Sequence, residues 1–419
     1  MAEPEPLPAP RSPRRALVFS GGGARGAYEA GVVRYLLEDL PRRLGHPIRF
    51  DIVCGTSVGA IHACYMAGTA DQGEGRAGRL VEVWTRMRVD EMLPFSSRQL
   101  LALPRRLLGL RRTAEAIRSG DVPERIYGLF DTRVLEHLVA SSIPWRSIRR
   151  NVRSGQLQAV CVAATQIATG RVTIFIESRE KRIAEWSRDP NLLPRPTHLL
   201  PVHALASAAI PVLFPAVLVG STYYADGGLR LNTPLAPALR LGADRVLVVA
   251  LRQNPDLARE AQLADQRVEN YASPVFLFGK VLNSLLLDPL DTDLARMHVM
   301  NELLDHGEIA CGPGFAERLN EVAQRERGQR YRRIRDVVIR PSADLGILAG
   351  QILENMERSR RRSPLLWLAA RNLGSDGRSP EADLLSYLLF DGEFVGPLVD
   401  LGYADARARE EELMAFFSD

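Results

Sequence analysis

A serine in a glycine-flanked turn is the first candidate for chemistry in this 419-residue chain. Gly55-Thr56-Ser57-Val58-Gly59 has the spacing G-x-S-x-G, and it stands between an apolar strand-like run at 51–54 and a helical segment at 58–67. In that setting the small neighbours allow a sharp turn, which exposes the serine hydroxyl above a sheet at the N-terminus of the next helix. The sequence therefore predicts that Ser57 is a nucleophile, with Gly55 and Gly59 supporting its turn.

A glycine-rich segment, Gly21-Gly22-Gly23-Ala24-Arg25-Gly26, stands between another strand-like run and another helical pattern. Consecutive glycines leave backbone N–H groups uncovered, so the loop could hold an oxyanion or a phosphate. The letters also fit the dinucleotide pattern G-x-G-x-x-G, which makes a nucleotide-binding regulatory module an alternative. That module needs an acidic residue at the end of the second strand, whereas Asp51 lies at its beginning. An oxyanion loop is therefore favoured.

A serine nucleophile also needs a base that takes its proton. Asp226-Gly227-Gly228 follows a strand-like run and supplies an aspartate in a turn. The alternative is a carboxylesterase of α/β-hydrolase type, in which a histidine follows the serine and the aspartate along the chain. His298 and His306 satisfy that order, although both lie in a helical stretch, and His62 is expected to face away from the serine. Both kinds of base stay open on these grounds.

The elements that must position these residues follow from hydrophobic periodicity. A strand at 16–20, a helix at 24–39, a strand at 51–54 and a helix at 58–67 alternate at the start of the chain. This order predicts an α/β fold with a parallel sheet and right-handed crossovers. Further strands are expected at 156–165, 171–177, 217–219, 222–224, 245–251 and 337–339, and a further helix at 202–210.

Taken together, these motifs resemble those of the patatin-like phospholipase family, including its bacterial members. The resemblance rests on the segments at 21–26, 55–59 and 226–228, on the element Ala206-Ser207-Ala208-Ala209-Ile210-Pro211, and more loosely on 385–403. It implies a three-layer α/β/α fold with a mostly parallel central sheet and a largely helical C-terminal extension. It also implies a Ser–Asp dyad without histidine.

The resemblance assigns roles to the motif residues. Ser57 would be the nucleophile and Asp226 the base. Backbone amides of the first three loop glycines would form the oxyanion hole, and the arginine of the loop would brace it or meet a lipid phosphate. In this sequence these loop residues are Gly21, Gly22, Gly23 and Arg25, and the supporting motif glycines are Gly26, Gly55, Gly59, Gly227 and Gly228. The implied activity is hydrolysis of acyl esters of phospholipids or lysophospholipids, without a metal or another cofactor.

Composition predicts the domain organisation. Residues 1–14 are rich in proline and are expected to form a disordered tail. The family resemblance implies a catalytic domain at residues 15–240, which contains an arginine-rich helical insert at about 71–150. Residues 241–419 are expected to complete the sheet and to add helices.

Charge and hydropathy limit the partners. The net charge of +4 is too small for this length to indicate nucleic acid. No apolar run reaches the ~18 residues of a membrane span, and the N-terminus lacks the apolar core of a secretory signal. The protein is therefore expected to be cytoplasmic, and the family resemblance implies that its partner is a lipid substrate. Two segments that are both apolar and basic, 92–112 and 273–290, are the candidates for peripheral membrane contact.

Overall fold

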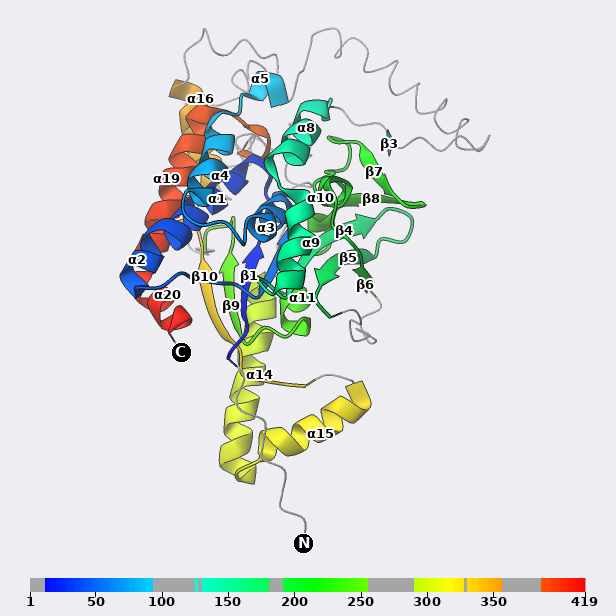
Figure 1. The fold of residues 1–419 in the computed structure, drawn as a ribbon, viewed down its shortest axis with the longest axis vertical. Coiled ribbons are helices and arrows are strands. Elements are labelled where there is room, and N and C mark those ends of the chain that lie inside the picture. The colour runs from blue at the N-terminus through cyan, green and yellow to red at the C-terminus, as the bar shows by residue number, and fades with distance from the viewer. Residues whose placement is uncertain are drawn as a thin grey trace, which may run out of the picture.

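A mixed sheet of ten strands lies at the centre of the computed structural model (Figure 1). The structure describes residues 12–92, 125–126, 130–180, 191–254, 290–327, 330–355 and 386–418. The strands within these residues are β1 (Arg15–Phe19), β2 (Ile52–Thr56), β3 (Arg125–Ile126), β4 (Ala159–Gln166), β5 (Val172–Ser178), β6 (Leu192–Pro196), β7 (Ala216–Val219), β8 (Thr222–Asp226), β9 (Arg245–Val249) and β10 (Arg335–Ile339). Neighbouring strands follow the order β10-β9-β1-β2-β4-β8-β7-β3, and β5 and β6 are added beside β4.

The region of the sheet around β1 is parallel, as the order of the first elements predicts. β1 is parallel to both β2 and β9, while β10 and β4 extend this region at its two sides. β8, β7 and β3 continue the sheet in antiparallel pairs. Leu17 and Phe19 pack into one hydrophobic cluster, whereas Ala16 and Val18 pack into a second one. Because side chains alternate along a strand, these two clusters lie on opposite faces of the sheet.

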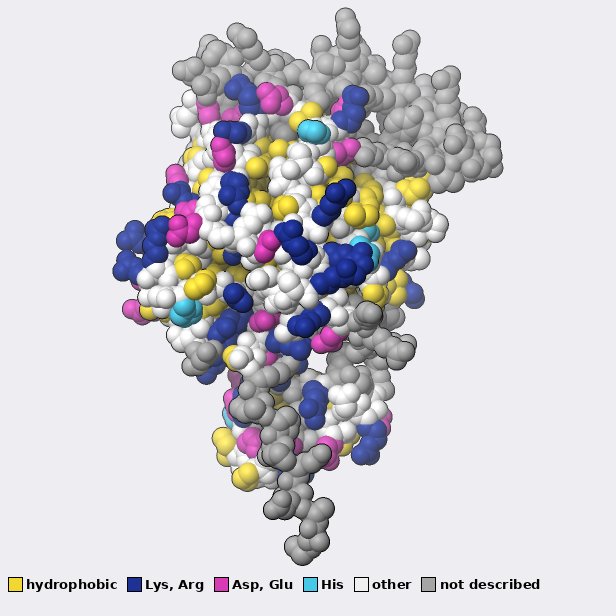
Figure 2. Space-filling view, viewed as in Figure 1, with side chains coloured by type: hydrophobic (Ala, Val, Ile, Leu, Met, Phe, Trp, Pro, Cys, Tyr) yellow, Lys and Arg dark blue, Asp and Glu magenta, His cyan; other side chains and the backbone are white. Residues whose placement is uncertain are grey.

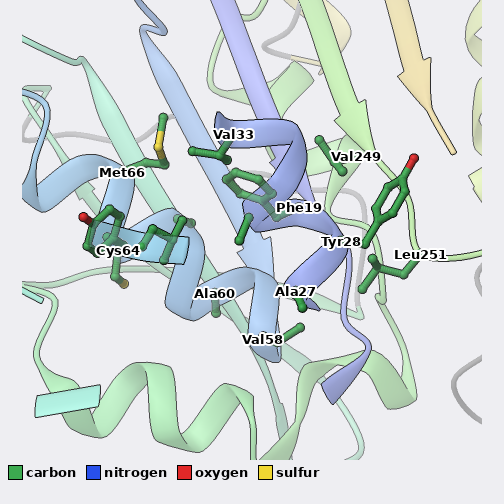
Figure 3. Packing of buried hydrophobic residues seen from close by; sticks show 14 of the residues in the cluster. Phe19, Ala27, Tyr28, Val33, Val58, Ala60, Cys64, Met66, Val249 and Leu251 are labelled. Carbon is green, nitrogen blue, oxygen red and sulfur yellow. The ribbon is translucent and has the colours of Figure 1, made fainter. Parts of the chain in front are cut away.

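Helices cover both faces. α1 (Gly26–Arg34), α3 (Val58–Gly68), α9 (Trp145–Ser154), α10 (Pro201–Ser207) and α19 (Gly392–Ala408) contribute to the larger cluster, and α11 (Leu235–Arg240) and α14 (Leu290–Cys311) contribute to the smaller one. The other described helices are α2 (Leu40–Leu44), α4 (Arg76–Thr85), α5 (Val89–Met92), α8 (Arg133–Ser142), α15 (Phe315–Arg327), α16 (Leu345–Asn355) and α20 (Glu410–Phe417). Figure 3 shows part of the larger cluster, in which Phe19 of β1 lies beside Val33 of α1. The predicted fold class is confirmed.

The arginine-rich helix α9 is amphipathic. Ile148 and Val152 are buried in the larger cluster, whereas Arg146, Arg149 and Arg153 are exposed. Figure 2 shows basic side chains on the face of the molecule where α9 lies in Figure 1. The density of arginine in this segment therefore reflects a solvent-facing helix surface above an apolar one.

Two elements differ from the sequence-based expectation. The helix expected at 24–39 is an α-helix only as far as Arg34, and a π-helical turn continues it over Tyr35–Asp39. Strand β6, which contains Pro194 and Pro196, was not among the expected strands. Among the described strands it pairs only with β5, and prolines are tolerated at such an edge because its outer side needs no hydrogen bonds to a neighbouring strand.

Some predicted segments lie outside the described residues. The two candidate membrane-contact segments, 92–112 and 273–290, fall there except for Met92 and Leu290, as does the tail before residue 12. Among the helices that the structure describes, none combines the length and the apolar character needed to cross a membrane.

Candidate active site

The turn between β2 and α3 places Ser57 at the carboxyl end of the parallel strands. Its φ angle of 55° lies in the left-handed region, which L-residues rarely adopt. The turn is so tight that a Cβ atom on Gly55 would lie 2.0 Å from the carbonyl oxygen of Gly59, and one on Gly59 would lie 2.6 Å from that of Ser20. The two motif glycines are therefore required by the close approach of the backbone, as the nucleophile-turn prediction implies.

Strand register brings Asp226 to this serine. Thr56 pairs with Ala163 of β4, and Asp226 of β8 pairs with the next residue, Ala164. β8 thus continues beside β4 from the point where β2 turns away, so Ser57 and Asp226 become neighbours. Ser57 Oγ donates a hydrogen bond of 2.6 Å to Asp226 Oδ2.

Backbone and side-chain donors hold the pair in place. The amide of Gly228 donates to Asp226 Oδ1 at 2.7 Å. The amide of Ser57 donates to Ser207 Oγ at 2.9 Å, and Ser207 in turn donates to the carbonyl oxygen of Ala163 at 2.5 Å. Ser207 belongs to the Ala-Ser-x-x-x-Pro element, which sequence reasoning noted without giving it a role. It ties the nucleophile turn to β4.

The hydrogen-bonded pair of Ser57 and Asp226 lies inside the protein. Asp226 is fully buried, and Ser57 is 4% exposed. Burial raises the pKa of Asp226 to about 6, although the hydrogen bonds from Ser57 and Gly228 act in the opposite direction. A carboxyl group with a pKa close to neutral can be ionised at pH 7 and still accept a proton readily.

The glycine-rich loop divides into an anchor and two open amides. The amide of Gly21 donates to the backbone carbonyl of Asn232 at 3.1 Å, and the Asn232 side chain donates back to Gly21 O at 3.2 Å. The amides of Gly22 and Gly23 make no hydrogen bond to the described residues. Of the three glycines expected to form an oxyanion hole, the structure therefore leaves these two amides available, while the Gly21 amide is used.

Residues of the C-terminal region hold the glycine-rich loop in place. Gly23 has a φ angle of +57°, and a Cβ atom there would lie 2.3 Å from the carbonyl oxygen of Tyr387. Arg25 is buried, its Nε donates to Ser386 Oγ at 2.7 Å, and its guanidinium carbon lies 4.1 Å from the centre of the Tyr387 ring. Of the two roles expected for Arg25, these contacts correspond to bracing the loop.

The remaining motif glycines also lie where chain segments come close. A Cβ atom on Gly227 would lie 2.3 Å from the carbonyl oxygen of Ala163, and one on Gly26 would lie 2.5 Å from Cγ2 of Val58. Both positions thus favour glycine because a side chain would come too close to a neighbouring segment.

An apolar pocket begins at Ser57. α3, α4 and α8 each line it with residues at helical i, i+3, i+4, i+7 spacing, and the segment after α10 and Phe390 complete its wall. The lining residues are Gly23, Ser57, Val58, Ile61, His62, Tyr65, Leu80, Val83, Trp84, Met87, Leu135, Leu138, Val139, Ser142, Ile143, Ala208, Ile210, Phe214 and Phe390. Sequence reasoning missed this pocket, although the three spacings are visible in the sequence.

The histidines have other partners. The Trp84 indole N–H donates to His62 Nε2 at 2.9 Å, so the ring proton is on Nδ1, which donates to Glu29 Oε2 at 2.6 Å. His62 therefore lines the pocket with both nitrogens occupied, and burial lowers its pKa to about 3. His298 binds Asp336 at 2.9 Å, and helix α14, which carries His298 and His306, lies toward the opposite end of the molecule from α3 (Figure 1).

Within the described residues no histidine is hydrogen-bonded to the dyad. The same part of the chain contains no cluster of histidine, cysteine and acidic side chains that could hold a metal ion.

Comparisons with known proteins match this region of the chain. A family model described as "Patatin-like phospholipase" matches residues 17–239. A cGAMP-activated phospholipase of Pseudomonas aeruginosa (strain BWHPSA011 / Pa011) is 32% identical over 222 residues, which are 52% of this chain and 53% of that protein, so the match spans about half of each. A crystal structure of VipD from Legionella pneumophila aligns with a TM-score of 0.29 and 12% identity over 93% of this chain and 67% of that chain, a likeness too low to support an argument.

Proposed function

Because the chain belongs to the patatin-like phospholipase family, we propose that it is a serine hydrolase that cleaves acyl ester bonds of phospholipids or lysophospholipids. The observation that carries this proposal is the hydrogen bond of 2.6 Å between Ser57 Oγ and the buried carboxyl group of Asp226. It joins a nucleophile to a base at one end of an apolar pocket, which Gly23 of the glycine-rich loop also lines.

The proposed reaction is acyl transfer to serine. Asp226 accepts the Ser57 proton while Oγ attacks the ester carbonyl carbon. The amides of Gly22 and Gly23 stabilise the oxyanion, and each such donor is typically worth ~3 kcal/mol. The alcohol leaves with the proton from Asp226, and water then attacks the acyl-enzyme with the same carboxylate as base. The N-terminus of α3 adds a favourable dipole at the site of developing negative charge.

The pocket is suited to the acyl chain. It is lined almost entirely by apolar side chains from three helices. Its one histidine, His62, is kept neutral, because burial lowers its pKa to about 3. Among the described residues that line the pocket, an acyl chain would therefore meet no charged side chain. Burial of its methylene groups would supply binding energy of ~0.8 kcal/mol for each group.

The two alternative functions receive less support. A histidine-dependent esterase would need a histidine beside Ser57, but both ring nitrogens of His62 are hydrogen-bonded elsewhere. A nucleotide-binding module would use the loop amides for phosphate and an acid for the ribose. The amide of Gly21 is already bonded to Asn232, and Asp51 accepts a hydrogen bond of 2.8 Å from the Arg15 amide at the start of β2.

Labelling with a fluorophosphonate probe followed by peptide mass mapping tests the dyad. We expect an adduct on Ser57, no adduct in Ser57→Ala, and labelling slowed ~100-fold or more in Asp226→Asn, because a general base contributes at least that factor. Ser141→Ala, which removes an exposed hydroxyl of α8, is the matched control and should be labelled at the wild-type rate. An adduct on another residue, or an unchanged rate in folded Asp226→Asn, would contradict the proposal.

Release of fatty acid from phosphatidylcholine and lysophosphatidylcholine in mixed micelles tests the substrate class. We expect release from at least one of these lipids by the wild-type chain and none by Ser57→Ala. If the protein reacts with the probe but releases fatty acid from neither lipid, the proposal of a reactive serine would stand. The proposal that its substrates are phospholipids or lysophospholipids would be contradicted.

A further inference from the structure

The apolar pocket has a defined direction, which runs along α3 away from the nucleophile. Val58, His62 and Tyr65 lie on one face of this helix and all line the pocket. With a helical rise of ~1.5 Å per residue, Tyr65 lies ~12 Å along the helix axis from Ser57. The pocket is therefore deep enough to take an extended hydrocarbon chain, and Tyr65 is at its far end.

Helix α4 runs in the opposite direction along the pocket. Its N-terminal residue Arg76 is next to Tyr65, because Tyr65 donates a hydrogen bond of 2.6 Å to the Arg76 carbonyl. Its C-terminal part is next to the nucleophile, since the Trp84 ring lies 3.1 Å from where a Cβ atom on Gly26 would be. Of the α4 residues that line the pocket, Leu80 is thus the deepest.

Helix α8 supplies the third side of the deep end. Ile143 follows its last turn and lines the pocket. The next residue, Pro144, lies 3.2 Å from where a Cβ atom on Gly68 would be, three residues beyond Tyr65 on α3. Tyr65, Leu80 and Ile143 therefore all lie toward the end of the pocket opposite Ser57.

Tyr65 is the member of this group that is fixed in place. Its side chain is 4% exposed, and the hydrogen bond of its hydroxyl to Arg76 O holds the ring between α3 and α4. A leucine or an isoleucine can change rotamer when a ligand presses on it, but the ring can move only if this hydrogen bond breaks. The phenol is thus a rigid stop.

We propose that the ring of Tyr65 is the floor of the acyl pocket and sets the longest acyl chain that the enzyme accepts. This inference rests on the proposed acyl-ester hydrolysis at Ser57. Chains that end before the ring bind fully inside the pocket, whereas longer chains must leave methylene groups in water or bend. Medium-length acyl chains are therefore the preferred substrates.

The test compares kcat/KM for p-nitrophenyl butyrate, octanoate, dodecanoate and palmitate. Wild-type enzyme should prefer octanoate or dodecanoate to palmitate. Tyr65→Ala removes the floor and should raise the ratio of palmitate to octanoate by ~10-fold or more, a factor in the range that pocket contacts with hydrocarbon produce. Tyr65→Phe keeps the ring and removes only the hydroxyl, so its chain-length preference should stay close to that of the wild type.

Two further variants keep the test decisive. Tyr65→Leu shortens the side chain while filling more space than alanine, and it should shift the preference in the same direction if Tyr65→Ala does not fold. Tyr403→Ala is the matched control, because it removes a half-buried tyrosine of α19 that bonds to Asp39 at 2.9 Å and does not line the pocket. It should leave the ratio unchanged.

The outcomes separate this inference from the proposed function. A wild-type protein that hydrolyses none of the esters would contradict the proposed function itself. Hydrolysis with an unchanged ratio in folded Tyr65→Ala and Tyr65→Leu, or a shift of equal size in Tyr403→Ala, would overturn the role of Tyr65 alone.

Discussion

Two carboxyl groups are completely buried on the same side of the sheet, and they differ in how their oxygens are used. Asp226 accepts hydrogen bonds at both oxygens, from the Ser57 hydroxyl and from the Gly228 amide. Glu29 accepts one at Oε2 from His62, while its Oε1 has no partner among the described residues. Burial raises the pKa of Asp226 to about 6 and that of Glu29 well above its usual value.

Because of this difference, Asp226 can act as a base, whereas Glu29 has a structural role. Donors at both oxygens stabilise the Asp226 carboxylate, so that its charged form is present at neutral pH. Burial favours the neutral form of Glu29 and outweighs the opposing effect of the Ser20 backbone amide. Its partner His62 fixes the Trp84 indole, which stacks on Phe390 in the pocket wall with ring centres 6.2 Å apart. The Glu29–His62 pair thus supports the pocket while the Ser57–Asp226 pair is placed to react in it.

Substitutions in the two pairs should have very different effects on catalysis. Ser57→Ala and Asp226→Asn are each expected to lower kcat/KM by ~10⁴-fold or more, because they remove the nucleophile or its base. Glu29→Gln keeps an oxygen that can accept from His62, so its kcat/KM should stay within a few-fold of the wild-type value. Steady-state kinetics on one uncharged ester, with circular dichroism to confirm folding, gives the comparison. A loss in Glu29→Gln as large as that in Asp226→Asn would place Glu29 in the reaction.

The pH dependence should report Asp226 and not Glu29. Only the carboxylate of Asp226 can accept the serine proton, so kcat/KM should be half-maximal near pH 6 and should fall about tenfold per pH unit below that. The profile of Glu29→Gln should coincide with that of the wild type. An activity that stays constant down to pH 4.5, or a midpoint that moves in Glu29→Gln, would break the assignment.

The raised pKa of Asp226 also predicts how the stability of the folded protein depends on pH. The pKa of Asp226 is higher in the folded state, about 6, than its usual value of 3.8, so the folded protein binds this proton more tightly. Its contribution to stability is therefore present at low pH and is lost as the pH rises through about 6. Since each pKa unit corresponds to ~1.4 kcal/mol, the burial of this charge costs roughly 3 kcal/mol at pH 7 and above. The charged form of the proposed base therefore lowers the stability of the folded protein.

The two pairs also differ in how far the sequence could reveal them. Ser57 is visible because its turn is local and its glycines are adjacent in the chain. Asp226 carries a short motif, but its place beside Ser57 depends on consecutive pairings along β4, to Thr56 and to Asp226, which no local pattern contains. Polar groups in helices are usually exposed, so nothing in the sequence indicated that Glu29 is buried against His62.

Long-range contacts explain the other gaps. The spacings on α3, α4 and α8 are ordinary core patterns, and only the fold shows that the three faces meet in one pocket. The contact of Arg25 with Ser386 joins positions 361 residues apart. The resemblance added Gly21 to Gly22 and Gly23 as an oxyanion-hole residue, whereas the Asn232 carbonyl distinguishes its amide from theirs. The sequence therefore indicated the two candidate loops, whereas the residues that contact them depend on long-range packing.

The smallest expected effect concerns the stability of the Glu29–His62 pair. Glu29→Leu leaves the Nδ1–H of His62 without an acceptor in a fully buried position, whereas Glu29→Gln retains one. An unpaired buried donor costs ~1–3 kcal/mol, so Glu29→Leu should have a free energy of unfolding lower than that of Glu29→Gln by this amount. Urea unfolding at pH 7.5 measures the difference. Equal stabilities would mean that the hydrogen bond to His62 contributes nothing to the pocket wall, and the distinction between a supporting and a reacting carboxyl group would then rest on Asp226 alone.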